Sequence, residues 1–220
     1  MKVLAVLPMR GGSQRVPKKN IRPLGGEPLF YHALSALENV STIDEIVVDS
    51  DSEEILELTK LRQTNSVSIS KRPARLGQNS TSMIEVLLWL VQQYRADWVL
   101  QTHSTSPFLS HLTISKAIQR VTEGPWDSAF GVTALRARLW DEKGGPINHN
   151  PSSLIPTQEL PPTYLENSAF YFFRPENLFE YGTRFGKNPL LYEVPLLEAI
   201  DIDTEEDFEL AEQLWKARSL

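Results

Sequence analysis

A loop near the start of the chain combines two adjacent glycines with a cluster of positive charges. The glycines are Gly11 and Gly12, and the cations are Arg10, Arg15, Lys18 and Lys19. Glycine lets the backbone approach a ligand closely, and successive backbone N–H groups can form an anion-binding nest. The loop therefore predicts a site for the phosphates of a nucleoside triphosphate. Its spacing matches neither G-x-x-x-x-G-K-[ST] nor G-x-G-x-x-G, and a solvated basic turn is the competing interpretation.

Two alternating carboxylates lie near the other end of the chain. Isoleucine and aspartate alternate over residues 200–203, which puts Asp201 and Asp203 on the same side of an extended segment. Carboxylates about 7 Å apart along a strand can share Mg²⁺, which also takes phosphate oxygens of a substrate. The pair therefore predicts a magnesium site for nucleotidyl transfer. An acidic start to the last helix is the competing interpretation, and it accounts for Glu205 and Glu206 but not for the alternation.

A second acidic pair, Asp49 and Asp51, ends a predicted strand at residues 44–48. A D-x-D pair in this place could hold a metal–nucleotide complex, as it does in many glycosyltransferases. That possibility is an alternative to the magnesium site at Asp201 and Asp203. A plain acidic helix start is an equally open interpretation, because carboxylates favour helix N-termini.

The composition is that of an acidic globular protein. The chain has 220 residues, a net charge of −6, 41% hydrophobic residues and no cysteine. This size favours one α/β domain, and the acidic balance argues against a nucleic-acid partner. Without cysteine there is no disulfide framework and no zinc–thiolate site. No segment matches a signal peptide or a membrane span, so we expect a cytoplasmic protein without a membrane partner.

Strand-like and helix-like segments alternate along the chain. Strands are predicted at residues 2–8, 44–48, 67–69, 98–100, 129–132, 169–173 and 191–194. Helices are predicted at residues 28–38, from 52 onward, and at 81–94, 112–121, 175–181 and 204–216. Ser80 or Thr81 is available to cap the third helix, and Thr204 and Asp207 resemble a capping box. This alternation predicts a Rossmann-like, mostly parallel sheet with helices on both faces, whose ligands bind at the carboxyl ends of the strands.

The alternation stops over about residues 134–166. Five prolines and two glycines fall there, together with large apolar side chains such as Trp140, Leu154 and Ile155. A structureless stretch of this length is uncommon in a compact domain unless it serves function or assembly. A disordered loop is the alternative, but it would expose these apolar side chains to water.

Short motifs carry a resemblance to a known family. Arg10-x-Gly12-Ser13, Pro17-x-Lys19-Asn20 and Gly26-x-Pro28-Leu29 resemble the N-terminal signature of the acylneuraminate cytidylyltransferases. Further matches cover essentially the whole chain. The resemblance implies one nucleotidyltransferase domain over residues 1–220, of the nucleotide-diphospho-sugar transferase type. It also implies that residues 134–166 form an arm that packs on a second subunit, so that the protein is a homodimer.

The resemblance further implies a reaction and its residues. CTP and a nonulosonic sugar acid would give a CMP-sugar and pyrophosphate with Mg²⁺ as cofactor. The expected nucleotide-binding residues are Arg10, Gly12, Ser13, Lys19, Asn20, Asp51, Arg72 and Ser82. The expected catalytic residues are Arg10, Lys19, Asp201 and Asp203, and the last two are the expected metal ligands. The expected sugar-binding residues are Gln158, Asn167 and either Gln101 or His103, since extra residues near position 103 leave that alignment open.

The chain departs from the family pattern at several positions. Asn79 replaces an aspartate, Ser168 replaces a glycine, and Thr157 stands where the family often has an arginine. That arginine would be a natural partner for a sugar carboxylate. A nucleotide-binding regulator without turnover is therefore a further alternative, beside the glycosyltransferase.

Overall fold

One seven-stranded sheet forms the centre of the molecule in the computed structural model, which describes residues 1–12 and 15–218. The strand order is β5-β4-β1-β6-β8-β7-β9. The strands are β1 (Val3–Met9), β4 (Glu45–Ser50), β5 (Val67–Lys71), β6 (Trp98–Thr102), β7 (Ser128–Leu135), β8 (Thr163–Phe173) and β9 (Pro189–Glu193). Pairing is parallel except that β8 runs antiparallel to β6 and β7. The predicted mostly parallel sheet is confirmed.

Helices cover both faces of this sheet. They are α1 (Leu29–Glu38), α2 (Glu53–Leu61), α3 (Met83–Gln93), α4 (His111–Thr122), α5 (Glu176–Glu180) and α6 (Glu205–Arg218). A short hairpin of β2 (Pro23–Leu24) and β3 (Glu27–Pro28) precedes α1. Within the described part of the chain, single turns of 3-10 helix lie at Lys19–Ile21, Ala74–Leu76 and Thr157–Glu159.

The apolar run of β1 shows why the sheet is covered twice. Val3, Ala5 and Leu7 pack with α1 and α4, whereas Leu4 and Val6 pack with α3 and α5. Successive side chains of a strand point to opposite faces, so a continuous apolar strand needs cover on both sides. The strand is fully buried, as the sequence pattern predicts.

Most element boundaries differ from the prediction by one to three residues, and two of the differences have a clear physical reason. The third helix is capped by Ser82 rather than by Ser80 or Thr81, because Ser82 and Glu85 form a reciprocal capping box. Strand β8 begins at Thr163 instead of residue 169, because its first half pairs with the extension of β7, in which Leu135 lies opposite Thr163. The predicted capping box of Thr204 and Asp207 is present at the start of α6.

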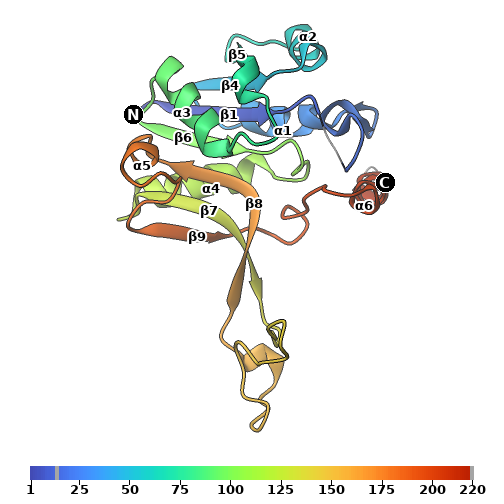
Figure 1. Ribbon diagram of the computed structural model, residues 1–220, viewed down its shortest axis with the longest axis vertical. Helices are drawn as coiled ribbons and strands as arrows, with labels where there is room; N and C mark the ends of the chain where they lie inside the picture. Colours follow the sequence, from blue (N-terminus) through green and yellow to red (C-terminus); the bar gives the residue numbers. More distant parts are fainter. Residues whose placement is uncertain (13–14, 219–220) are drawn as a thin grey trace.

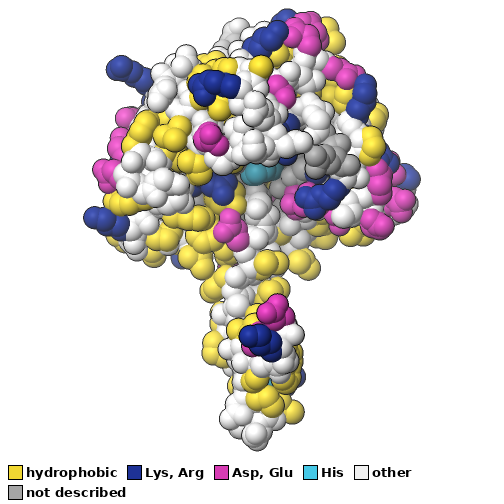
Figure 2. Space-filling view, in the orientation of Figure 1, with side chains coloured by type: hydrophobic (Ala, Val, Ile, Leu, Met, Phe, Trp, Pro, Cys, Tyr) yellow, Lys and Arg dark blue, Asp and Glu magenta, His cyan; other side chains and the backbone are white. Residues whose placement is uncertain are grey.

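Residues 136–162 project from the sheet as an arm. The arm continues the ribbon of β7 and β8 away from the rest of the molecule (Figure 1). Its surface is rich in hydrophobic side chains (Figure 2), and Trp140, Ile147 and Leu154 are 52%, 61% and 66% exposed.

Helix α6 lies beside the carboxyl edge of the sheet, away from the main helical layers (Figure 1). Its Phe208 and Ala211 pack in a small cluster with Val16, Leu24 and Ile202. This cluster joins two segments. One is the loop that carries Arg10, Arg15, Lys18 and Lys19, called the cationic loop below, and the other carries Asp201 and Asp203. Among the described residues, no helix is long and apolar enough to cross a membrane.

Candidate active site

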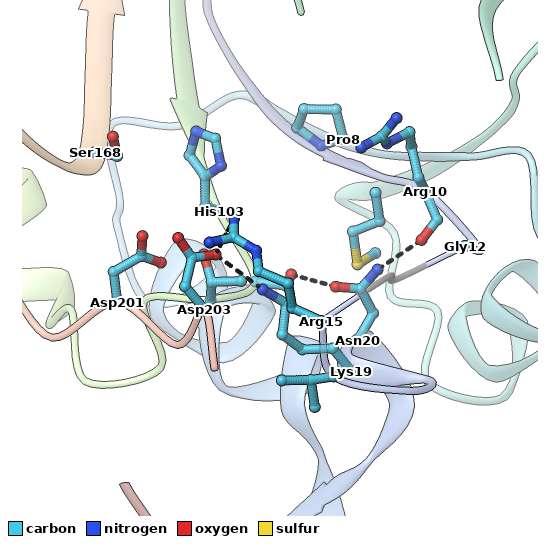
Figure 3. A pocket seen from close by; sticks show the side chains of 14 residues that line it. Pro8, Arg10, Gly12, Arg15, Lys19, Asn20, His103, Ser168, Asp201 and Asp203 are labelled. Atoms are coloured by element: carbon cyan, nitrogen blue, oxygen red, sulfur yellow. Dashed lines mark hydrogen bonds and ion pairs between the residues drawn. The ribbon is translucent and has the colours of Figure 1, made fainter. Parts of the chain in front are cut away.

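A cavity of about 340 Å³ opens at the carboxyl ends of β1 and β6 (Figure 3). Parallel strands end at this edge, and so do the loops that follow them. The lining residues are Pro8, Met9, Arg10, Gly12, Arg15, Val16, Lys19, Asn20, His103, Ser104, Thr105, Ser168, Asp201 and Asp203. The cationic loop and the acidic pair, which are separated by most of the sequence, therefore share one cavity.

Lys19 connects these two features directly. Its ammonium Nζ donates to the carbonyl oxygen of Ile202 at 2.6 Å and lies 3.3 Å from the Asp203 carboxylate. Arg15 approaches the same carboxylate at 3.3 Å. The Lys19 side chain is only 13% exposed, and so its charge is directed into the cavity rather than into bulk water. Cations at this distance neutralise a carboxylate and also attract phosphate oxygens.

Asn20 links the cationic loop to the segment that follows β6. Its amide nitrogen donates to the carbonyl of Arg10 at 2.8 Å, and its amide oxygen accepts from the Ser104 hydroxyl at 2.7 Å. On the other side of the loop, the N–H of Gly11 donates to Asp51 at 2.8 Å. Among the described residues, and leaving out its chain neighbours, no atom lies within 4 Å of a Cβ atom built on Gly12.

The acidic pair follows the predicted alternation. Ile202 is fully buried, and its N–H donates to the carbonyl of Thr105 at 2.9 Å, while Asp201 and Asp203 line the cavity. Burial raises the pKa of Asp201, and its buried Oδ1 has no hydrogen-bond partner among the described residues. An orphaned carboxylate oxygen beside a second carboxylate suits a hard, oxygen-binding cation. The described residues contain no cluster of three or more His, Cys, Asp or Glu side chains arranged for a metal, so further ligands would come from substrate and water.

His103 occupies another part of the cavity wall. Burial lowers the pKa of His103 to about 4, and the neighbouring charges of Arg184 and Lys19 act in the same direction. The imidazole is therefore neutral at physiological pH. Gln101, the other candidate for sugar contact, is fully buried behind it.

The second acidic pair does not form a metal site. Asp49 is fully buried, lies 2.5 Å from the guanidinium of Arg72 and accepts a hydrogen bond from Ser70. Asp51 is exposed and binds the backbone of the cationic loop instead. The interpretation of Asp49 and Asp51 as joint metal ligands is wrong, because a buried carboxylate neutralised by arginine offers no oxygen to a metal ion.

The structure places several predicted site residues away from the main cavity. Arg72 borders a neighbouring hollow of about 290 Å³ that also contains Arg10 and Asn79. Ser82 caps α3, and Asn167 donates to Thr133 within the ribbon of β7 and β8. Gln158 is exposed on the arm. Ser13 lies outside the described residues.

One residue beside the site, Arg184, carried no sequence signal. Arg184 contacts Gln101 and Tyr171 from the segment after α5, where no motif marks it. Ser168 has a backbone φ of 57°, a left-handed conformation that favours glycine. This conformation explains physically why a glycine is expected at the position.

The fold and the site define a class of protein: an α/β protein with a Rossmann-like, mostly parallel sheet, in which a cationic loop and an acidic pair meet at the carboxyl edge. Solved structures share the fold. CMP:2-keto-3-deoxy-manno-octonic acid synthetase complexed with CTP aligns over 100% of both chains with a TM-score of 0.74 at 17% identity. A 4-diphosphocytidyl-2C-methyl-D-erythritol synthase from Anaerococcus prevotii aligns over 98% of this chain and 96% of its own, with a TM-score of 0.72 at 15% identity.

The chain belongs to the cytidylyltransferase family, whose sequence profile matches residues 4–220. It is 31% identical to N-acylneuraminate cytidylyltransferase A of Danio rerio, over 96% of this chain and 50% of that protein. It is 28% identical to a pseudaminic acid cytidylyltransferase of Campylobacter jejuni, over 98% of this chain and 97% of that protein. The chain thus spans about half the length of the fish relative and nearly all of the bacterial one.

Proposed function

We propose that this protein couples CTP to a nonulosonic, sialic-acid-like sugar acid, giving a CMP-sugar and pyrophosphate. The observation that carries the proposal is the single cavity in which the glycine-containing cationic loop faces Asp201 and Asp203. Family membership supports CTP as the nucleotide, and relatives named for acylneuraminate, pseudaminic and diacetyllegionaminic acids support the class of acceptor. Two further points belong to the proposal: a homodimer formed through the arm, and a cytoplasmic location.

In the proposed in-line displacement, the residues of the cavity have different roles. The sugar hydroxyl would attack the α-phosphorus of CTP, a new P–O bond would form, the bond to the pyrophosphate oxygen would break, and the hydroxyl proton would pass to water. Arg10, Lys19 and the backbone at Gly12 would hold and neutralise the triphosphate. The hollow beside Arg72 and Asn79 would receive the cytosine ring of CTP.

Asp201 and Asp203 are the groups that would hold Mg²⁺. When bound, Mg²⁺ supplies charge neutralisation at the phosphoryl oxygens. Lys19 would keep Asp203 oriented through its two contacts, with the Asp203 carboxylate and with the carbonyl of Ile202. His103 and Ser168 line the side of the cavity beside Asp201, where they would orient the sugar (Figure 3).

Pyrophosphate release from CTP and Mg²⁺, measured against a panel of nonulosonic and octulosonic acids, tests this function. We expect release with one acid and its loss in the Asp201→Asn/Asp203→Asn variant. Glu206→Gln is the matched control, because it removes an exposed carboxylate in the first turn of α6. CTP binding without release for any acid would contradict the proposal and favour a regulator without turnover.

A further inference from the structure

A chain of three side chains connects Arg184 to the cavity. The Arg184 guanidinium lies 3.3 Å above the ring centroid of Tyr171, and its Nη1 donates to Oε1 of Gln101 at 3.0 Å. The Nε2 atom of Gln101 lies 2.9 Å from Nε2 of His103. Gln101 is fully buried, so no water competes for its amide.

The directions of the hydrogen bonds among Arg184, Gln101 and His103 follow from which groups can donate and which can accept. Arginine only donates, so the amide oxygen of Gln101 must face Arg184 and the amide NH₂ must face His103. That NH₂ group also only donates. The Nε2 atom of His103 therefore accepts and carries no proton, which leaves the proton of the neutral ring on Nδ1.

The remaining nitrogen of His103 is available to a ligand. The ring lines the cavity (Figure 3), and within the described part of the chain Nδ1 has no hydrogen-bond partner. His103 lies on the same side of the cavity as Ser168 and Asp201, whereas Arg10 and Gly12 lie on the other (Figure 3). The low pKa of His103, which results mainly from burial, also favours the neutral ring.

We propose that Arg184 is a positioning residue: through the Gln101 amide it holds His103 in the Nδ1–H tautomer, which donates a hydrogen bond to an acceptor oxygen of the sugar acid. His103 is then a specificity-determining donor and not the base that removes the hydroxyl proton. Its Nε2 lone pair is occupied by Gln101, and its Nδ1 already carries a proton. The identity of the ligand rests on the proposed function, but the tautomer does not.

Side-chain ¹H–¹⁵N correlation spectra of the histidines, recorded without substrate, test the tautomer. The chain has four histidines, and a His103→Gln spectrum identifies the signals of His103. We expect the Nδ1–H pattern in the wild type. Gln101→Glu has the same shape but offers only acceptors, so it should move the proton to Nε2. An Nε2–H pattern in the wild type, or no change in Gln101→Glu, would overturn the proposal.

Kinetics of Arg184→Met test the consequence for binding. This variant keeps an unbranched side chain over Tyr171 but frees the Gln101 amide to rotate. We expect the KM for the sugar acid to rise about tenfold while the KM for CTP changes less than about twofold. A merely structural role would lower the thermal midpoint and change both constants together.

The matched control is Arg174→Met, because Arg174 also lies over an aromatic ring, that of Trp98 at 4.4 Å, and does not line the cavity. It should leave both constants unchanged. Wild-type constants in Arg184→Met would contradict the positioning role. If the wild type turned over no sugar acid, the proposed function would fail while the spectra would still decide the tautomer.

Discussion

At the scale of single residues, two adjacent lysines show how position in the fold selects a role. Lys18 is exposed and pairs with Glu54 at 3.0 Å, outside the cavity. Lys19 is mostly buried and contacts Ile202 and Asp203 within it. The sequence alone does not distinguish the two lysines, because both belong to the same cationic loop.

Lys19→Ala should therefore lower kcat/KM for CTP by about 100-fold or more, because it removes from the cavity the positive charge that we propose neutralises the triphosphate. Lys18→Ala is the matched control and should stay within about threefold, since exposed ion pairs contribute little. Steady-state kinetics of both variants at one ionic strength provide the comparison. Equal losses in the two variants would contradict the assignment.

His103 predicts a dependence of stability on pH. Its folded-state pKa of about 4 lies below the ordinary value of 6.5, so between these values the unfolded chain binds more protons than the folded one. Stability should therefore fall as the pH falls from 6.5 toward 4, by at most about 3 kcal/mol from this group. Arg184 and Lys19 reinforce the shift, and Asp203 opposes it.

Urea unfolding at about pH 7 and about pH 4.5 measures this effect. His103→Gln removes the titrating group, so the variant should lose less stability than the wild type between the two values. The same loss in both proteins would show that other groups account for the acid sensitivity.

At the scale of elements, the β2–β3 hairpin supports α6. Gly25 in the hairpin has a φ of 60°, and a Cβ atom there would lie 1.9 Å from Nε1 of Trp215 in α6. The same cluster holds Ile202 and Val16, so the packing of α6 positions both walls of the cavity. The geometry of the acidic pair thus depends on an element that contributes no side chain to the cavity lining.

Gly25→Ala should destabilise the protein by about 3 kcal/mol, because strain at positive φ adds to a clash with the indole ring. Gly182→Ala is the matched control: its φ is 65°, but apart from its chain neighbours no described residue has an atom within 4 Å of the added Cβ atom. This control should lower the free energy of unfolding by only about 1 kcal/mol. Urea unfolding of the two variants separates the clash from the backbone strain, and equal losses would contradict close packing of α6 on the hairpin.

At the scale of the whole molecule, the arm is an unusual surface for a folded domain. Its apolar side chains are exposed, and it carries Gln158, a predicted sugar-binding residue, away from the cavity of its own chain. A second copy would cover the apolar surface and would receive Gln158 at its cavity. Both features support the proposed homodimer.

Complementation between two inactive variants tests this arrangement. Asp203→Asn impairs the cavity of the subunit that carries it, and Gln158→Ala removes the predicted sugar-binding side chain from the arm of the subunit that carries it. If the arm serves the other subunit, mixed dimers should contain one intact site, and an equal mixture that exchanges subunits should recover about one quarter of wild-type activity. If the arm serves its own chain, no intact site forms and no activity should return. Light scattering of the separate proteins checks that each variant is dimeric.

The sequence by itself determined the class of fold and the main parts of the site. The apolar run of β1 required cover on both faces, and the alternation of residues 200–203 set Asp201 and Asp203 on the side opposite the buried Ile202. These patterns are local, because the periods of strands and helices are written in consecutive residues. The capping box of Thr204 and Asp207 was predictable for the same reason.

Only the tertiary structure decided which polar groups face the cavity and which are used inside the protein. It paired Asp49 with Arg72, placed Gln101 behind His103 and brought in Arg184 from a segment without a motif. These contacts join residues far apart in the chain, and the same side chain binds a ligand or a neighbour according to what burial places beside it. A local pattern cannot encode that choice, because the free energy of a buried charge or amide depends on its partners in space.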